Sequence, residues 1–250
     1  KSENQVPLEM HKVRVVQKLN LLPVDERLRA IQKAGNNTFL LQNKDIYLDM
    51  LTDSGVNAMS DRQTAAMHLA DDAYAGSETF NRLKVAIKEV FGTDNVLPAH
   101  QGRACENILA ERFVKPGTVA IMNFHFTTTK AHVTRCGGEV VEVLHKKGLI
   151  PQSDDPFKGD MDLQELRRVI TEYGPDKVAY VRVEAGTNLI GGQPVSLENM
   201  LAVADICHEF GVPSILDASL LQGNLYFMKI REEQCKYMTP KEIYHLLAGK

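Results

Sequence analysis

The sequence contains no tryptophan, no long apolar run and no excess of charge of either sign. Its 29 Lys and Arg residues nearly balance 32 Asp and Glu residues, without a long block of like charge. A nucleic-acid-binding or polybasic membrane-binding protein carries a basic surplus, so this balance argues against both classes. The sequence has neither a stretch long enough to span a bilayer nor a secretory signal pattern at its start, which predicts a soluble, cytoplasmic protein.

Cysteine is also scarce, and internal repeats and low-complexity segments are absent. The four cysteines, at positions 105, 136, 207 and 235, lack the paired spacing of a metal site. They are typical of reduced thiols in a cytoplasmic protein. A chain of 250 residues is long enough for one large or two small domains with a sizeable core.

The stretch from Pro213 to Ser219 contains a short apolar run that ends in an acid, Asp217. Such a run predicts a buried strand that delivers one carboxylate at its carboxyl end, where ligands bind in open α/β sheets. A buried carboxylate needs a cation or hydrogen-bond donors. Asp217 therefore pairs with the protonated ring nitrogen of pyridoxal phosphate, caps the next helix, or binds a metal or a ribose.

Strand and helix patterns alternate between about residues 95 and 217, which predicts a mostly parallel sheet covered by helices. The expected strands end at an acid or just before a polar loop, and the expected helices end at glycine or an aromatic residue. The strands are predicted at residues 118–122, 139–144, 178–183 and 213–217, and the helices at 104–113, 163–173 and 197–210.

The first third of the chain is less regular. Helices are predicted at residues 24–34, 61–70 and 80–91, and short strands at 38–41 and 46–51. The turn Thr52-Asp53-Ser54-Gly55 is either a plain loop or a phosphate or cation contact. The segment from Asp71 to Glu78 is either a solvated loop or part of a site.

Four polar or aromatic groups are predicted at the carboxyl ends of strands. Gln101-Gly102-Arg103 opens a helix and forms either an anion site or a plain turn. Phe126 either stacks on a planar ring or packs in the core, and Asn188 follows a buried strand. Each signal is weak by itself, but with Asp217 the four groups predict one site.

Longer motifs resemble those of the tyrosine phenol-lyase and tryptophanase family, which are β-eliminating lyases that use pyridoxal phosphate. The resemblance runs from about Pro23 to His245. Residues 126–129 and 59–61 resemble the phenol-lyase branch more than the tryptophanase branch. The motifs are Asp25-Glu26-Arg27-Leu28, Asn37-Thr38-Phe39-Leu40-Leu41, Leu51-Thr52-Asp53-Ser54-Gly55, Asp72-Ala73-Tyr74-Ala75-Gly76-Ser77, His100-Gln101-Gly102-Arg103 and Gly191-Gly192-Gln193-Pro194-Val195-Ser196.

The resemblance implies how the cofactor is held. Gln101, Gly102 and Arg103 would hold its phosphate. Phe126 would stack on the pyridine ring, while Asn188 would face the 3-hydroxyl group. Asp217 would pair with the ring nitrogen.

The resemblance also implies roles around the substrate. Tyr74 would act as an acid–base group in a neighbouring subunit's site, and Thr127 would contact the phenolic leaving group. Thr52 would bind the substrate. Gly55 and Asp72 match positions of a potassium site, although the family usually has Glu where Asp72 stands.

The implied fold is the aspartate-aminotransferase-like α/β fold (pyridoxal-phosphate fold type I), with a mostly parallel sheet of the seven-stranded type. Residues 1–55 would form an N-terminal arm and part of the small domain, and residues 56–250 the cofactor-binding large domain, incomplete at its C-terminal end. The implied reaction is β-elimination from an aromatic L-amino acid, which gives phenol, pyruvate and ammonia from tyrosine. The implied assembly is a homotetramer.

Two departures from the family pattern leave alternatives open. The family has Arg where Leu220 stands, which favours a tryptophanase-like enzyme or a C–S lyase with another leaving group. The family's Schiff-base lysine is expected beyond Lys250, as is the C-terminal small domain. The chain is therefore expected to be inactive alone, as a fragment or as half of a split enzyme whose second polypeptide carries the C-terminal half.

Overall fold

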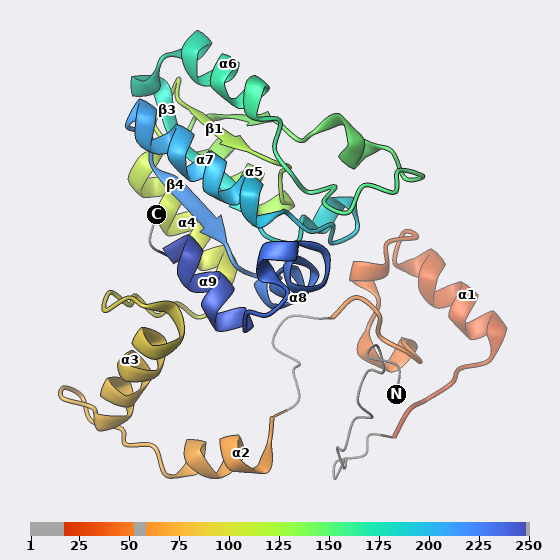
Figure 1. Cartoon of the computed structure of the whole chain (residues 1–250). Coiled ribbons are helices and arrows are strands. Elements are labelled where there is room, and N and C mark those ends of the chain that lie inside the picture. Colours follow the sequence, from red (N-terminus) through yellow and green to blue (C-terminus); the bar gives the residue numbers. More distant parts are fainter. Residues whose placement is uncertain (1–17, 53–58, 249–250) are drawn as a thin grey trace, which may run out of the picture. The chain divides into compact units, whose positions relative to one another are not determined.

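The computed structural model describes residues 18–52 and 59–248. The chain divides into two compact units, residues 1–70 and 71–250 (Figure 1). This division falls 15 residues after the domain boundary that the sequence analysis placed after residue 55. That domain boundary stays a prediction. Within the described ranges, no helix is long and apolar enough to cross a membrane.

The first unit contains two of the predicted helices, α1 (Val24–Lys33) and α2 (Asp61–His68). The strands predicted at 38–41 and 46–51 are wrong. Thr38–Leu40 and Asn43–Asp45 are short 3-10 helices, the first of which begins where the Asn37 side chain accepts the N–H of Phe39. Asp49 accepts two backbone N–H groups in the second segment, and such local side-chain bonds favour turns over strands.

The second unit contains a parallel sheet of four strands in the described residues. These are β1 (Val119–Met122), β2 (Glu139–Glu142), β3 (Val178–Glu184) and β4 (Ser214–Asp217), in the order β2-β1-β3-β4. All three pairings are parallel. Every residue of β1 and β3 is buried, which explains why their sequences are nearly continuous apolar runs.

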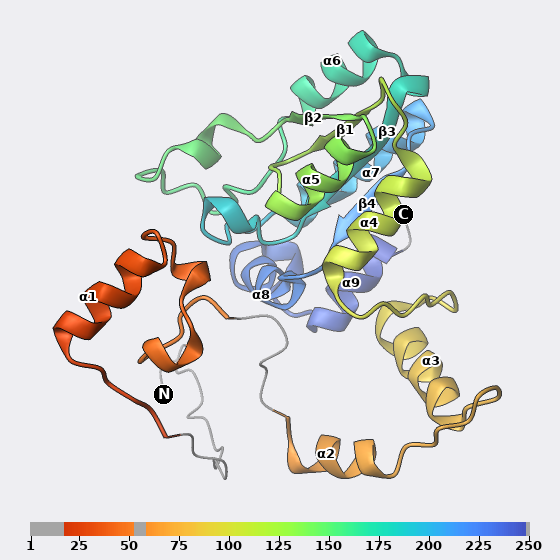
Figure 2. The same cartoon turned by 180° about the vertical axis from the view of Figure 1, so that it is seen from behind.

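Helices cover both faces of this sheet (Figures 1 and 2). α4 (Gly102–Phe113) and α5 (Thr127–Arg135) pack on one face, where Ala110 and Val133 meet Met122. α6 (Leu163–Tyr173) and α7 (Leu197–Phe210) pack on the other face. This arrangement confirms the predicted α/β class. The remaining helices of this unit are α3 (Glu78–Phe91), α8 (Leu221–Arg231) and α9 (Pro240–Ala248).

The start of α7 is fixed by a half-buried carboxylate. Asp160 accepts the backbone N–H of Ser196 at 2.7 Å and the Ser196 hydroxyl at 3.0 Å, while Ser196 itself caps α7. Burial is the largest influence on Asp160 and raises its pKa to about 6, although the bonds from Ser196 act in the opposite direction. The carboxylates of Asp155 and Glu232 add to the rise.

The Asp160 carboxyl predicts a specific pH dependence of stability. Its pKa is raised in the folded protein, so the folded state holds this proton up to about pH 6, whereas the unfolded chain loses it near pH 4. Its contribution to the free energy of unfolding is therefore complete below about pH 4 and falls as the pH rises through 6. The loss is on the order of 3 kcal/mol.

Urea unfolding between pH 4 and 7 measures this effect. Asp160→Asn should remove the part of the decrease that occurs between pH 4 and 6, and Asp154→Asn, at an exposed position in the same loop, should retain it. The same decrease in both variants would show that Asp160 is not its source.

Candidate functional site

The carboxyl ends of β1, β3 and β4 lie at one edge of the sheet, because these strands are parallel neighbours. The chain runs from β1 outward to β2, then returns to β3 and continues to β4 on the other side. The change of direction between β1 and β3 is the topological switch point at which open α/β sheets bind ligands. Asn188 follows β3 and Asp217 ends β4, so two predicted site residues are at this edge.

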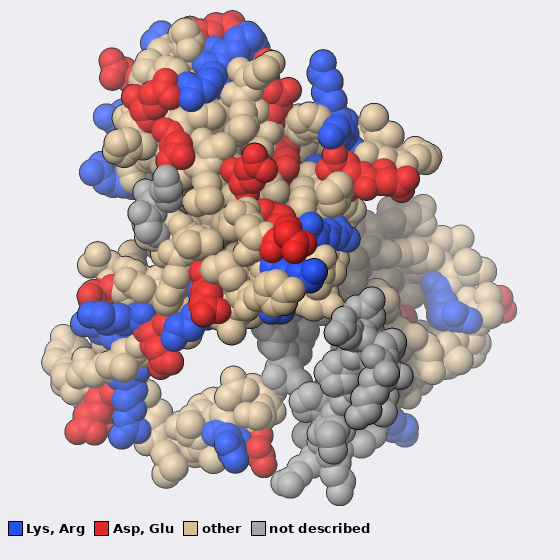
Figure 3. Space-filling model, viewed as in Figure 1, with Lys and Arg blue, Asp and Glu red and all other residues tan. Residues whose placement is uncertain are grey.

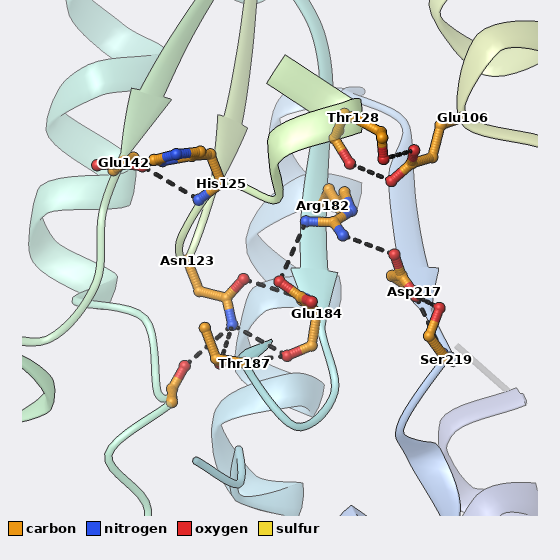
Figure 4. A network of polar contacts seen from close by, with 12 residues as sticks. Glu106, Asn123, His125, Thr128, Glu142, Arg182, Glu184, Thr187, Asp217 and Ser219 are labelled. Atoms are coloured by element: carbon orange, nitrogen blue, oxygen red, sulfur yellow. Dashed lines mark hydrogen bonds and ion pairs between the residues drawn. The ribbon is translucent and has the colours of Figure 1, made fainter. Parts of the chain in front are cut away.

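Asn123, the residue after β1, holds this edge together (Figure 4). Its buried side-chain amide donates to the backbone oxygens of Gly159 and Glu184, each at 3.1 Å, and to the Thr187 hydroxyl at 3.0 Å. Its oxygen accepts the N–H of Glu184 at 3.1 Å. The sequence analysis missed Asn123, although an amide directly after an apolar strand is a usable signal.

Asp217 forms a short ion pair with a residue that the sequence analysis also missed. Arg182, on β3, is 3% exposed, and its Nη2 donates to Asp217 Oδ2 at 2.6 Å. The other oxygen, Oδ1, accepts the backbone N–H of Ser219 at 3.0 Å and the Ser219 hydroxyl at 2.6 Å. Burial alone would raise the pKa of Asp217, but Arg182 and Ser219 outweigh it and lower this pKa below its usual value. Asp217 is therefore a fixed carboxylate at neutral pH.

Glu184 is a second buried acid beside Arg182, and burial raises its pKa. Glu184 Oε2 lies 3.6 Å from Arg182 Nη1, which is an ion pair but too long for a good hydrogen bond. Within the described part of the chain, both atoms are buried without a hydrogen-bond partner. The sequence does carry a signal for this cluster, because Arg182 and Glu184 stand at alternate positions of an otherwise apolar strand.

Two helices begin near the sheet edge and are tied to one another. α4 starts at Gly102, after Gln101 in an extended conformation. The hydroxyls of Thr128 and Thr129, in the first turn of α5, both donate to the Glu106 carboxylate of α4. Gln101, Gly102 and Arg103 are exposed, and a Cβ added at Gly102 would meet no neighbouring atom within 4 Å. The exposed N–H groups at this end of α4 can bind an anion.

The prediction that Gln101 follows a strand is wrong. Residues 93–100 form no strand. The Thr93 hydroxyl accepts the N–H of Asn95 in a local turn, and Pro98 has no N–H to donate to a neighbouring strand. The segment predicted to bind the phosphate thus lies at the start of α4 rather than at the end of a strand.

Two further predicted residues lie next to these elements. Phe126 is half-buried and immediately precedes α5, whose first residue, Thr127, is exposed. Asn188 is exposed and begins the short 3-10 helix Asn188–Ile190. Its loop is anchored by the buried Asn224, which accepts the N–H groups of Gly186 at 2.9 Å and Val195 at 2.8 Å.

The remaining predicted residues belong to other segments of the chain. Tyr74 and Asp72 are exposed in the loop that precedes α3. Thr52 belongs to the first unit, where Asp49 accepts its N–H at 2.9 Å. Gly55 is outside the described residues. Over the ranges that the structure describes, no three His, Cys, Asp or Glu side chains come together as a metal site.

Comparisons with known proteins agree on one family. The model described as "Beta-eliminating lyase" matches residues 49–238. Tyrosine phenol-lyase of Fusobacterium nucleatum is 41% identical over 239 residues, which are 96% of this chain and 52% of that protein. Tyrosine phenol-lyase of Pasteurella multocida is 41% identical over 237 residues, 95% of this chain and 52% of that protein. The chain thus spans about half the length of these curated relatives.

Among solved structures, N-succinyldiaminopimelate aminotransferase from Mycobacterium tuberculosis aligns with a TM-score of 0.47 and 19% sequence identity. The alignment covers 61% of this chain and 39% of that one.

The position of Asn123 predicts that this amide stabilises the site edge. Asn123→Ala would leave the backbone groups of Glu184 and the Gly159 oxygen without their partner, at a cost of about 2 kcal/mol or more in the free energy of unfolding. Urea unfolding measures this loss, with the exposed Asn81→Ala as the control. Equal stability of the two variants would contradict the role assigned to Asn123.

Proposed function

The chain belongs to the β-eliminating lyase family, and on that premise we propose that it forms the cofactor-binding part of a pyridoxal-phosphate-dependent lyase that acts on an amino acid. The observation that carries this proposal is the carboxylate of Asp217, which is held at the carboxyl end of a parallel strand by Arg182 and Ser219.

The hydrogen bonds of Asp217 support a protonated ring nitrogen as a further partner. A carboxylate has about four acceptor positions. Three of them are used by Arg182 and by the N–H and hydroxyl of Ser219. The Asp217 side chain is 16% exposed, so part of it is open to a ligand. A cation with one N–H donor, such as a pyridinium ring, could donate to this oxygen.

The start of α4 supports the binding of the phosphate. The free N–H groups that follow Gln101 and the side chain of Arg103 would neutralise a phosphate dianion, because the helix dipole and the guanidinium act in the same direction. The open space at Gly102 lets a phosphate approach the backbone closely. Phe126, beside the start of α5, would cover the ring face, and Asn188 would donate to the ring hydroxyl.

When bound, pyridoxal phosphate supplies an electron sink for the bond that is broken at the α-carbon. The part of Asp217 is to hold a proton on the ring nitrogen, which keeps that sink electron-deficient. Tyr74 would move a proton to the leaving group, and its exposed side chain is free to reach a neighbouring subunit. Thr127 would orient the leaving group through its hydroxyl.

The relatives favour tyrosine as the substrate, since the two proteins that are 41% identical carry the name tyrosine phenol-lyase. The products would then be phenol, pyruvate and ammonia. Leu220 favours another leaving group, such as indole or a thiol. The Cβ of Leu220 lies 2.8 Å from the position that a Cβ added at Gly186 would take. The apolar side chain of Leu220 therefore packs close to the turn at Gly186, whereas the family resemblance implies a cation at position 220.

Pyruvate release distinguishes these substrates. The full-length protein is supplied with pyridoxal phosphate and, separately, with L-tyrosine, L-tryptophan and an S-alkylcysteine. We expect pyruvate and phenol from tyrosine. Pyruvate only from tryptophan or the S-alkylcysteine would identify the other leaving group, while release from none of them would indicate a non-catalytic protein or one that needs a second polypeptide.

Asp217→Asn should lower the rate of pyruvate release by roughly two to three orders of magnitude, because a neutral amide cannot stabilise the ring proton. Asp176→Asn, at an exposed position, is the matched control and should retain the rate. Circular dichroism of both variants checks that the fold is preserved. A folded Asp217→Asn protein with an unchanged rate would place the ring elsewhere.

A potassium ion, a homotetramer and a cytoplasmic location complete this proposal. Asp72 and Gly55 would contribute to the potassium site. Replacement of K⁺ by Na⁺ in the pyruvate assay should then lower the rate, and an equal rate in both salts would remove potassium from the proposal. Sedimentation of the purified protein would report whether four copies assemble.

A further inference from the structure

We propose that Arg182 is a positioning residue for the cofactor. Its guanidinium holds Asp217 so that the proton shared with the pyridine ring resides on the ring nitrogen. Glu184 supplies the second negative charge, so that two carboxylates balance the guanidinium and the protonated ring. This inference rests on the proposed function, because the ring is the group that Asp217 would receive.

The first argument is the cost of burying Arg182. Its side chain is 4% exposed within a strand whose residues are all buried. A buried guanidinium is tolerated only with partners that compensate for its lost hydration. Asp217 supplies one at 2.6 Å, and Glu184 supplies a longer contact at 3.6 Å. A core position with no other task would carry an apolar residue at lower cost.

The second argument is the register of the two strands. Arg182 pairs with Ile215, and Glu184 pairs with Asp217, on parallel strands. The guanidinium therefore reaches toward the carboxyl end of the sheet to meet Asp217, while Glu184 lies two residues farther along β3, on the same face (Figure 4). The three charges are thus concentrated at the proposed site.

The third argument is the charge of this cluster. One guanidinium faces the half-buried carboxylate of Asp217 and the buried carboxylate of Glu184. Arg182 Nη1 and Glu184 Oε2 both lack a hydrogen-bond partner among the described residues. With both carboxylates ionised the cluster carries one excess negative charge, so a cation bound at Asp217 would complete it. Arg182 Nη2 contacts the Asp217 carboxylate at 2.6 Å, whereas a ring nitrogen bound on the other side of this carboxylate would lie farther from the guanidinium. The positive charge of Arg182 would therefore stabilise the ionised carboxylate more than it would destabilise a protonated ring, which favours this charged pair over the neutral pair.

The test measures protons rather than turnover. The carboxyl carbon of Asp217 is observed by ¹³C NMR in protein labelled at aspartate, and its signal is assigned by its loss in Asp217→Asn. The variants are Arg182→Met, Arg182→Lys and the double variant Arg182→Met/Glu184→Leu. The double variant keeps the experiment interpretable if Arg182→Met fails to fold, because it leaves no unpaired charge at Glu184. Arg167→Met, which breaks an exposed pair with Glu209, is the control.

In the protein without cofactor, we expect the proton affinity of Asp217 to rise at least tenfold, a shift of one pH unit or more, in Arg182→Met and in the double variant. Arg182→Lys should restore most of the native value, and Arg167→Met should leave it unchanged. With pyridoxamine 5′-phosphate labelled with ¹⁵N in the ring, the ring signal should be that of a protonated nitrogen in the native protein and move toward the unprotonated value in the double variant.

An Asp217 titration that is the same in the native protein and in a folded double variant would overturn the proposal. A titration that shifts, with a ring nitrogen that stays protonated in the double variant, would also overturn it, since Arg182 would then not decide where the proton resides. If pyridoxamine phosphate does not bind to the native protein, the proposed function fails, and the titration without cofactor separates that outcome from a failure of the clamp.

Discussion

Arg182 and Asp217 are charged groups that β3 and β4 bring together at the carboxyl edge of the sheet. Neither charge is stable there alone, since burial penalises both. Because Arg182 Nη2 and the two donors of Ser219 hold Asp217 from three directions, this carboxylate has a fixed orientation and one acceptor position left. The proposed cofactor site depends on this constraint.

The surrounding fold keeps that edge in place. Asn123 joins the end of β1 to the end of β3, and Asn224 anchors the loop that carries Asn188. Glu106 ties α4 to the start of α5. Buried amides and hydroxyls fix backbone positions by direction as well as by distance, so they set the geometry of the edge where apolar packing alone would not.

The sequence predicted the sheet and most of the helices because their signals are local. The run that ends at Asp217 and the glycine stop at Gly211, which has φ of 66°, were sufficient to place β4 and the end of α7. Arg182 was not predicted, since its role depends on a partner 35 residues away on a neighbouring strand. The strand expected at 38–41 was wrong because the Asn37 side chain accepts the N–H of Phe39, and this local bond favours a turn over the strand preference of these residues.

The central claim is that Asp217 receives the ring nitrogen of pyridoxal phosphate, and a crystal structure of the protein grown with this cofactor tests it most directly. The account predicts a ring nitrogen within hydrogen-bond distance of an Asp217 oxygen, with Arg182 still paired to that carboxylate and the phosphate at the start of α4. A cofactor bound with its ring nitrogen away from Asp217 would contradict it.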